Sequence, residues 1–220
     1  MGILSGITSK TPEKVLLHAG AFFANMDAAD YNTVAELKAA MKAAYNNTGT
    51  GARCLGATRG GGTFQPGITM RQMEADGARG RVKGLEEIDE ILPHLTTTLL
   101  EIDPANMSIA VFAADTSKNG EKTTVTPRYD VKASDYIDAL TWVGQIKGGG
   151  YAAITLYNTI NTSTSGITFN DKNEATLPVD FVGETDGIDE MLDWDKPPYA
   201  IAYFQPDGTL SPAQPETQQT

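Results

Sequence analysis

The stretch YAAITLYNT, residues 151–159, indicates the fold class, because a segment of this kind bounded by glycine and asparagine is typical of a β-strand. Segments of the same type follow it in the chain. Each is bounded by Gly, Asn, Asp or Pro, and they lie at 166–171 (GITFND), 176–184 (TLPVDFVGE) and 199–204 (YAIAYF). The second half of the chain therefore predicts a series of strands.

Two more strands are predicted in the first half. Residues 94–102 (HLTTTLLEI) place Leu95, Thr97 and Leu99 on one face, which predicts a long strand. Residues 68–76 (ITMRQMEAD) alternate loosely between apolar and polar side chains, which also favours a strand.

Residues 84–92, GLEEIDEIL, fit two interpretations. The spacing of Leu85, Ile88 and Leu92 suits a helix, whereas a short strand leading into the next predicted strand fits equally well. Both alternatives stay open on the sequence alone.

Residues 33–45, TVAELKAAMKAAY, predict the clearest helix. Thr33 and Glu36 have the spacing of a capping box, in which each side chain binds a free backbone donor of the first turn. Strong helix formers follow, and Asn46 ends the pattern. A shorter helix is predicted from Asp103 to Phe112, with proline in its first turn.

These elements predict a mainly β, mostly antiparallel protein with one flanking α-helix at about residues 33–45. Strands and helices do not alternate regularly, which disfavours a doubly wound α/β fold. We expect one domain over residues 1–206. Residues 207–220 are rich in Pro, Gln and Thr and have too few apolar side chains to offset their ordering entropy, so we expect a flexible tail.

The charge and the cysteine content limit the function classes. The net charge is −11, and only Arg79, Arg81 and Lys83 form a basic cluster, so specific nucleic-acid binding is disfavoured. One cysteine, Cys54, permits no internal disulfide. No apolar run is long enough to span a bilayer and no secretory signal is evident, so we expect a protein made in the cytoplasm without a membrane partner.

The sequence shows no catalytic constellation. His18 lies among apolar neighbours, where a core or interface histidine is the expected interpretation, and His94 begins a predicted strand. A Cys54–His nucleophile pair remains a minor alternative. The acidic run 184–195 lacks calcium-loop spacing, and the glycines of 56–64 and 147–151 lack phosphate-loop spacing. We therefore expect no catalytic residues, no cofactor and no metal.

Several segments in collinear order resemble the major tail tube proteins of long-tailed bacteriophages. They cover residues 15–204, and the order carries the resemblance better than any one motif. The segments are GAFF (20–23), LGATRGGGTF (55–64), MRQMEADGARGRVKG (70–84), HLTTTLLEIDPANM (94–107), DYIDALTWVGQI (135–146), 154–183 and PPYAI (197–201). Ala200 departs from the pattern, which has an acidic residue at that point.

The resemblance implies an antiparallel β-sandwich or barrel of the tail tube type with a flanking helix. It implies hexameric rings of this chain, stacked into a hollow tube around the tape measure protein and ended by tail terminator and tail tip proteins. DNA would pass through the lumen during ejection without specific binding. The mature location would be the phage tail of the virion, after synthesis in the cytoplasm of a bacterial host.

The same resemblance suggests where the subunits meet and what faces the lumen. Glu74, Asp76 and Glu101 are candidate lumen-facing carboxylates, with ordinary surface carboxylates as the alternative. The candidate subunit contacts are Arg59, Gly60, Gly61 and Gly62 in one stretch and Arg79, Arg81 and Lys83 in another. A plain surface turn is the alternative for the glycines.

Three rival functions belong to other classes. A carbohydrate-binding or adhesin-like β-sandwich would need an exposed aromatic platform, but Tyr199 and Tyr203 share one face of a predicted strand, where core packing explains them better. A contractile-sheath component would normally be a longer chain. A hydrolase would need an acid–base pair that the sequence does not present.

Overall fold

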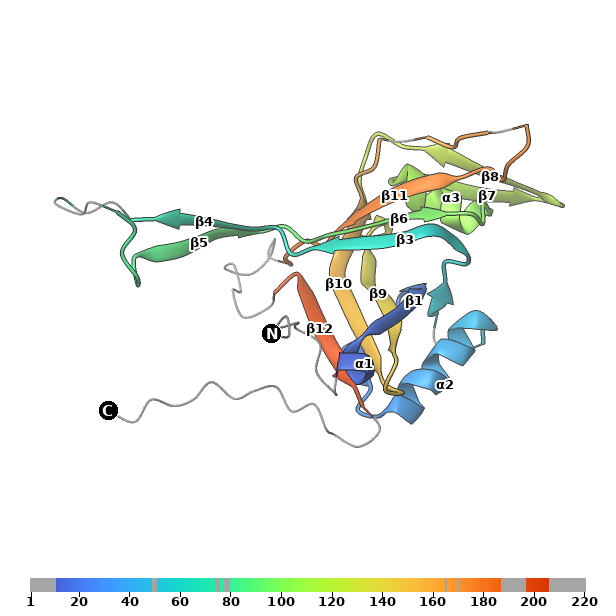
Figure 1. Ribbon diagram of the computed structural model, residues 1–220. Coiled ribbons are helices and arrows are strands. Elements are labelled where there is room, and N and C mark those ends of the chain that lie inside the picture. Colours follow the sequence, from blue (N-terminus) through green and yellow to red (C-terminus); the bar gives the residue numbers. More distant parts are fainter. Residues whose placement is uncertain are drawn as a thin grey trace.

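The computed structural model of the protein describes residues 11–48, 51–73, 76, 80–164, 166–169, 171–186 and 197–205 (Figure 1). Within these ranges the chain is mainly β and its strands pair antiparallel, as the sequence predicts. The tail expected at residues 207–220 lies outside the described residues. None of the helices in the described ranges has the length and apolar character needed to cross a membrane.

The strands of the body form two layers. One layer contains β2 (Arg53–Cys54), β1 (Leu16–Ala24), β9 (Ile137–Ile146), β10 (Tyr151–Asn161) and β12 (Tyr199–Phe204) in that order. The other contains β11 (Leu177–Val182), β6 (His94–Leu99) and β3 (Thr58–Gln65). Two hairpins lie outside these layers, β4 (Ile68–Gln72) with β5 (Glu86–Ile91) and β7 (Ala114–Asn119) with β8 (Lys122–Pro127).

Strand β10 belongs to both layers. Its first half pairs with β12, from Tyr151 to Leu156, and its end pairs with β11 at Ile160 and Asn161. Between them Asn158 adopts a left-handed φ of 46°, a conformation that asparagine tolerates better than most residues. The strand therefore turns the corner of the sandwich at Asn158.

The core has two parts, one on each face of the larger layer. Successive strand residues point to opposite faces, so Phe22 packs between the two layers, whereas Phe23 packs under helix α2 (Val34–Tyr45). Leu95, Thr97 and Leu99 are buried on one face of β6, as predicted.

The predicted helices are confirmed. Thr33 caps α2, its hydroxyl accepts from the Glu36 amide at 3.2 Å, and the Glu36 carboxylate accepts from the Thr33 amide at 3.1 Å. Helix α3 (Pro104–Val111) begins after Asp103, whose side chain accepts from the Asn106 amide at 2.6 Å. Two short 3-10 turns (Ala28–Asp30 and η2, Ala133–Asp135) and the four-residue α1 (Thr11–Lys14) complete the helical elements of the described ranges.

One open alternative is resolved and three sequence interpretations change. Residues 84–92 contain a strand, since β5 pairs with β4. The strand predicted at 166–171 is wrong as a continuous element, since in its described part only Thr168 makes a bridge, to Thr176. His18 is exposed, not in the core, and Tyr203 is 64% exposed, so core packing accounts for Tyr199 but not for Tyr203.

Asn106 joins α3 to two loops. Its side-chain amide is buried and donates to the carbonyls of Leu55 at 3.0 Å and Glu101 at 2.8 Å, while its oxygen accepts from Arg53 at 2.7 Å. Buried polar groups that lose their partners cost free energy, so this one side chain holds the loop after β6 against the loop after β2.

We expect Asn106→Ala to lower the free energy of unfolding by about 1–3 kcal/mol, because the buried carbonyl of Leu55 and the partly buried carbonyl of Glu101 lose their donor. Urea unfolding followed by circular dichroism measures the change. Asn173→Ala, at an exposed position outside the strands, is the matched control and should change stability by less than about 0.5 kcal/mol. Equal stability of the two variants would contradict this role for Asn106.

Candidate assembly surface

The hairpin of β4 and β5, here named the arm, projects from one end of the body (Figure 1). Its base is fixed by Gly67 and Leu92. The Leu92 amide donates to the Gly67 carbonyl at 3.0 Å, and a Cβ on Gly67 would lie 1.7 Å from the Leu92 carbonyl oxygen. Gly67 also has a left-handed φ of 59°, so only glycine fits this close approach.

One face of the arm is apolar. Ile68 stands opposite Ile91 and Met70 opposite Ile88, and paired residues on antiparallel strands share a face. A regular strand would place Ile88 and Ile91 on opposite faces, since they are three residues apart. The irregularity between Thr69 and Met70 accommodates the extra residue and keeps both isoleucines on the same face.

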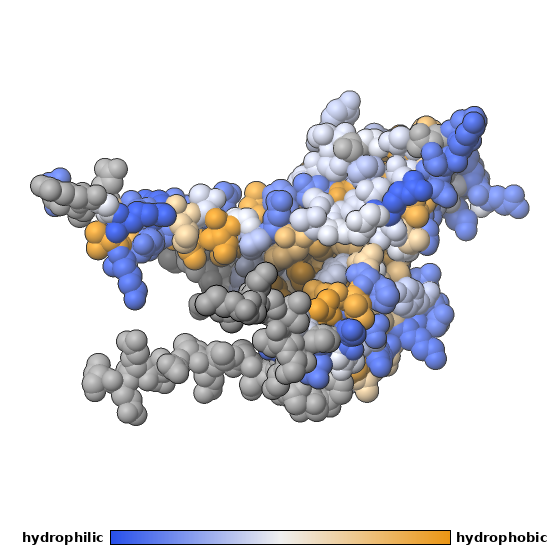
Figure 2. All heavy atoms as spheres, viewed as in Figure 1, coloured by the Kyte–Doolittle hydropathy of each residue, from blue (hydrophilic) through white to orange (hydrophobic). Residues whose placement is uncertain are grey.

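This apolar face is exposed. Met70 is 54% exposed, Ile88 48% and Ile68 44%. Met73 and Val82, beyond the ends of the strands, are also exposed. Figure 2 shows hydrophobic residues gathered along the arm, away from the body. An isolated two-stranded hairpin is marginally stable in water, so the arm lacks the packing that its side chains require.

The opposite face of the arm is charged. Arg71 stands opposite Glu87 and forms ion pairs with Glu87 and Asp89, the latter at 2.8 Å. Both partners are solvent-exposed, and such exposed pairs contribute little stability. The arm is therefore a two-faced element with no core of its own.

Several sequence candidates lie at the distal part of the arm. Asp76, Arg81 and Lys83 are exposed there, and Arg81 donates to the Gln72 side chain at 3.2 Å. Glu74 and Arg79 lie outside the described residues. The structure thus brings the described members of this group onto one projecting element, where contact with a second molecule remains a prediction.

The second candidate group lies on β3. Arg59 is ion-paired with Glu174 at 2.6 Å. Gly60 and Gly61 have left-handed φ values of 77° and 76° and lie where the register of β3 against β6 shifts. The expected bend is thus an irregularity within a strand, and it borders a groove of about 600 Å³ lined mainly by threonine and serine hydroxyls.

Gly62 has a different role from its two neighbours. A Cβ at this position would lie 2.7 Å from the Thr96 carbonyl oxygen and 2.9 Å from the Phe22 ring. The close packing of β3 on β6 and on the core therefore explains Gly62 without any second molecule.

Glu101 lies apart from both groups. Its carboxylate accepts from the Ala57 amide at 2.9 Å and occupies the space where a Cβ of Gly56 would be. It lines a cavity of about 620 Å³ together with His18 and Cys54. Burial raises the pKa of the Cys54 thiol, and a protonated thiol is a poor nucleophile.

Two long strand edges of the body are unpaired within the described ranges. β12 pairs only with β10, and β3 pairs only with β6. The exposed side chains of Ile201 and Tyr203 lie on β12. Such edges can accept a strand from another chain.

Among the described residues, no group of three or more His, Cys, Asp and Glu side chains is placed to hold a metal ion. No protein-family model matches the chain, and no curated protein sequence matches it.

We expect Gly62→Ala to destabilise the isolated protein by about 1–3 kcal/mol, because the added methyl group meets backbone and core atoms. Gly80→Ala is the matched control, since a Cβ there meets nothing within 4 Å and neither glycine has a left-handed φ. Thermal unfolding of both variants at low concentration measures the difference. If the Gly62 variant is as stable as the control, packing does not explain this glycine, and Gly62 is again a candidate subunit contact.

Proposed function

We propose that this chain is a structural, non-catalytic subunit that assembles with copies of itself into the tail tube of a long-tailed bacteriophage. The exposed apolar face of the arm is the observation that carries the self-assembly. Hexameric rings would stack into the hollow tube around the tape measure protein, and the tube would be part of the virion.

The arm supports assembly on energetic grounds. Large apolar side chains on a hairpin without a core lose free energy when another surface covers them, at about 25 cal/mol per Å² of apolar area. Contiguous exposed apolar surface of this kind is typical of interaction sites. Because the arm projects from one end of the body, the surface that covers it belongs most simply to another copy.

The unpaired edges of β3 and β12 support ring formation. Closing a ring gives each exposed edge a partner, which removes the sites for uncontrolled strand pairing. A heterologous contact closes into a ring when its rotation closes and continues as a filament when it does not. A tube of stacked rings requires both kinds of contact, and this chain offers the edges for one and the arm for the other.

The resemblance in sequence supports the tail tube specifically. Its segments include most of β4 and the chain from there to Gly84, the strands β6, β9 and β11, and the second part of β10. The net charge of −11 is consistent with a lumen that lets DNA slide without binding. Asp76 and Glu101, with Glu74 outside the described residues, remain the candidate lumen carboxylates.

Electron microscopy of the purified protein over a concentration series, paired with light scattering for mass, tests the proposal. Six-fold rings or hollow tubes are the expected result. A protein that stays monomeric at every concentration, and also after addition of tail-tip extract, would contradict it.

We expect Ile88→Asp to abolish stacking, because it places a charge in the centre of the apolar face of the arm. The concentration required for tubes should rise by a factor of about 100 or more. Light scattering measures that concentration.

Ala35→Asp is the matched control, since it introduces the same charge at an exposed position in the first turn of α2, away from the arm. It should leave tube formation within about threefold of the wild type, and circular dichroism should show both variants folded. Equal loss in both variants would mean that the apolar face is not the contact.

A further inference from the structure

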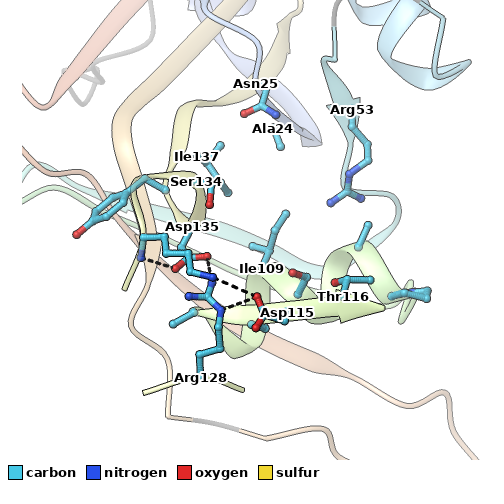
Figure 3. Close-up of a pocket in the computed structure, with 17 residues that line it drawn as sticks. Ala24, Asn25, Arg53, Ile109, Asp115, Thr116, Arg128, Ser134, Asp135 and Ile137 are labelled. Atoms are coloured by element: carbon cyan, nitrogen blue, oxygen red, sulfur yellow. Dashed lines mark hydrogen bonds and ion pairs between the residues drawn. The ribbon is translucent and has the colours of Figure 1, made fainter. Parts of the chain in front are cut away.

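A cavity of about 610 Å³ lies at the end of the body opposite the arm, between the end of β1, β2, α3, the β7–β8 hairpin and the 3-10 turn η2 (Figures 1 and 3). Three cationic side chains line it, Arg53, Arg128 and Lys132, with the carboxylates of Asp115 and Asp135. Cations thus outnumber carboxylates in this cavity, although the chain as a whole carries a net charge of −11.

Arg128 forms several ion pairs on one side of this cavity. Only 10% of its side chain is exposed, and it forms ion pairs with Asp115 at 2.8 Å, with Asp130 at 3.8 Å and with Asp135. Lys132 lies 3.6 Å from Asp115. These contacts join β7 and β8 to η2, and Figure 3 shows them on one side of the cavity.

Arg53 lies across the cavity from this cluster (Figure 3). Its partner is the neutral side-chain oxygen of Asn106 at 2.7 Å, and it forms no salt bridge with any carboxylate that the structure describes. The side chain is half-buried. A guanidinium that is partly removed from water and has four further N–H donors requires an anionic partner to offset its desolvation.

We infer that Arg53 receives a carboxylate from the arm of a second copy of this chain. The inference rests on the proposed self-assembly and names one contact within it. Guanidinium and carboxylate match in geometry and charge, which favours this class of partner over a neutral group.

The acidic strand β5 of the arm is the partner that the fold favours. It carries four carboxylates, of which Glu87 and Asp89 already pair with Arg71. The side chain of Glu90 has no ion pair or hydrogen bond within the described part of the chain, and the Glu86 carboxylate accepts one bond, from the Gly84 amide at 2.9 Å. Each is available to accept from Arg53. They lie on opposite faces of the arm, so one of the two makes the contact and the test replaces both.

The placement of the two surfaces agrees with a head-to-tail contact. The arm and the cavity are at opposite ends of the body (Figure 1), so the arm of one molecule can meet the cavity of the next while its own cavity stays available. Such a heterologous contact repeats from copy to copy.

A charge exchange tests the contact, with the concentration for half-assembly measured by light scattering. Arg53→Glu alone and Glu86→Lys/Glu90→Lys alone should each raise that concentration by about tenfold or more, because like charges then face each other. All three substitutions on one chain should restore it to within about threefold of the wild type. Glu121→Lys, an exposed acidic residue in the turn between β7 and β8, is the control and should have no effect.

Arg53→Gln keeps a hydrogen-bond donor for Asn106, and it replaces Arg53→Glu in the experiment if that variant does not fold. Combined with Glu86→Gln/Glu90→Gln it should weaken assembly no more than either change alone, since both remove the same contact. If the effects of the Arg53 and Glu86/Glu90 substitutions on assembly are additive, or if the triple charge-exchange variant still assembles poorly, the arm is not the partner of Arg53. The proposal of self-assembly would then still stand. Failure of the wild-type chain to assemble would overturn both proposals.

Discussion

Strand β10 is hydrogen-bonded on one side to β9 along most of its length and on the other side first to β12 and then to β11. Both of its edges are therefore occupied, and both layers depend on it. The change of partner requires a corner, which the left-handed backbone at Asn158 supplies. The Asn158 amide also donates to the Glu184 carbonyl at 3.3 Å, which ties the corner to the chain that leaves β11.

The sequence predicts the elements whose signals are local. The capping box of α2 needs only Thr33 and Glu36, and β12 occupies the residues expected for it because turn residues bound it. β5 stayed ambiguous because Ile88 and Ile91 are three residues apart, a helical spacing that only the irregular pairing with β4 reconciles with a strand. The sequence analysis did not predict the β7–β8 hairpin, although glycine at the first position of its two-residue turn, Gly120-Glu121, is typical of hairpins.

The candidate surface was predictable only in part. The glycines of β3 stand out in the sequence, but their different roles do not. Gly62 packs on β6, whereas Gly60 and Gly61 bend the chain. This difference depends on contacts between segments that are distant in the sequence. Arg53 has no sequence signal at all, because a missing carboxylate partner is a property of the folded chain. The apolar face of the arm required the register of β4 and β5.

The close approach of Gly67 and Leu92 at the base of the arm prevents the hairpin from sliding along the body. The reach of the arm is then set by bond lengths and by the rise of about 3.3 Å per strand residue. In a tube built through the arm, the hairpin would act as a molecular ruler, and the axial period would change in steps when pairs of residues are added or removed.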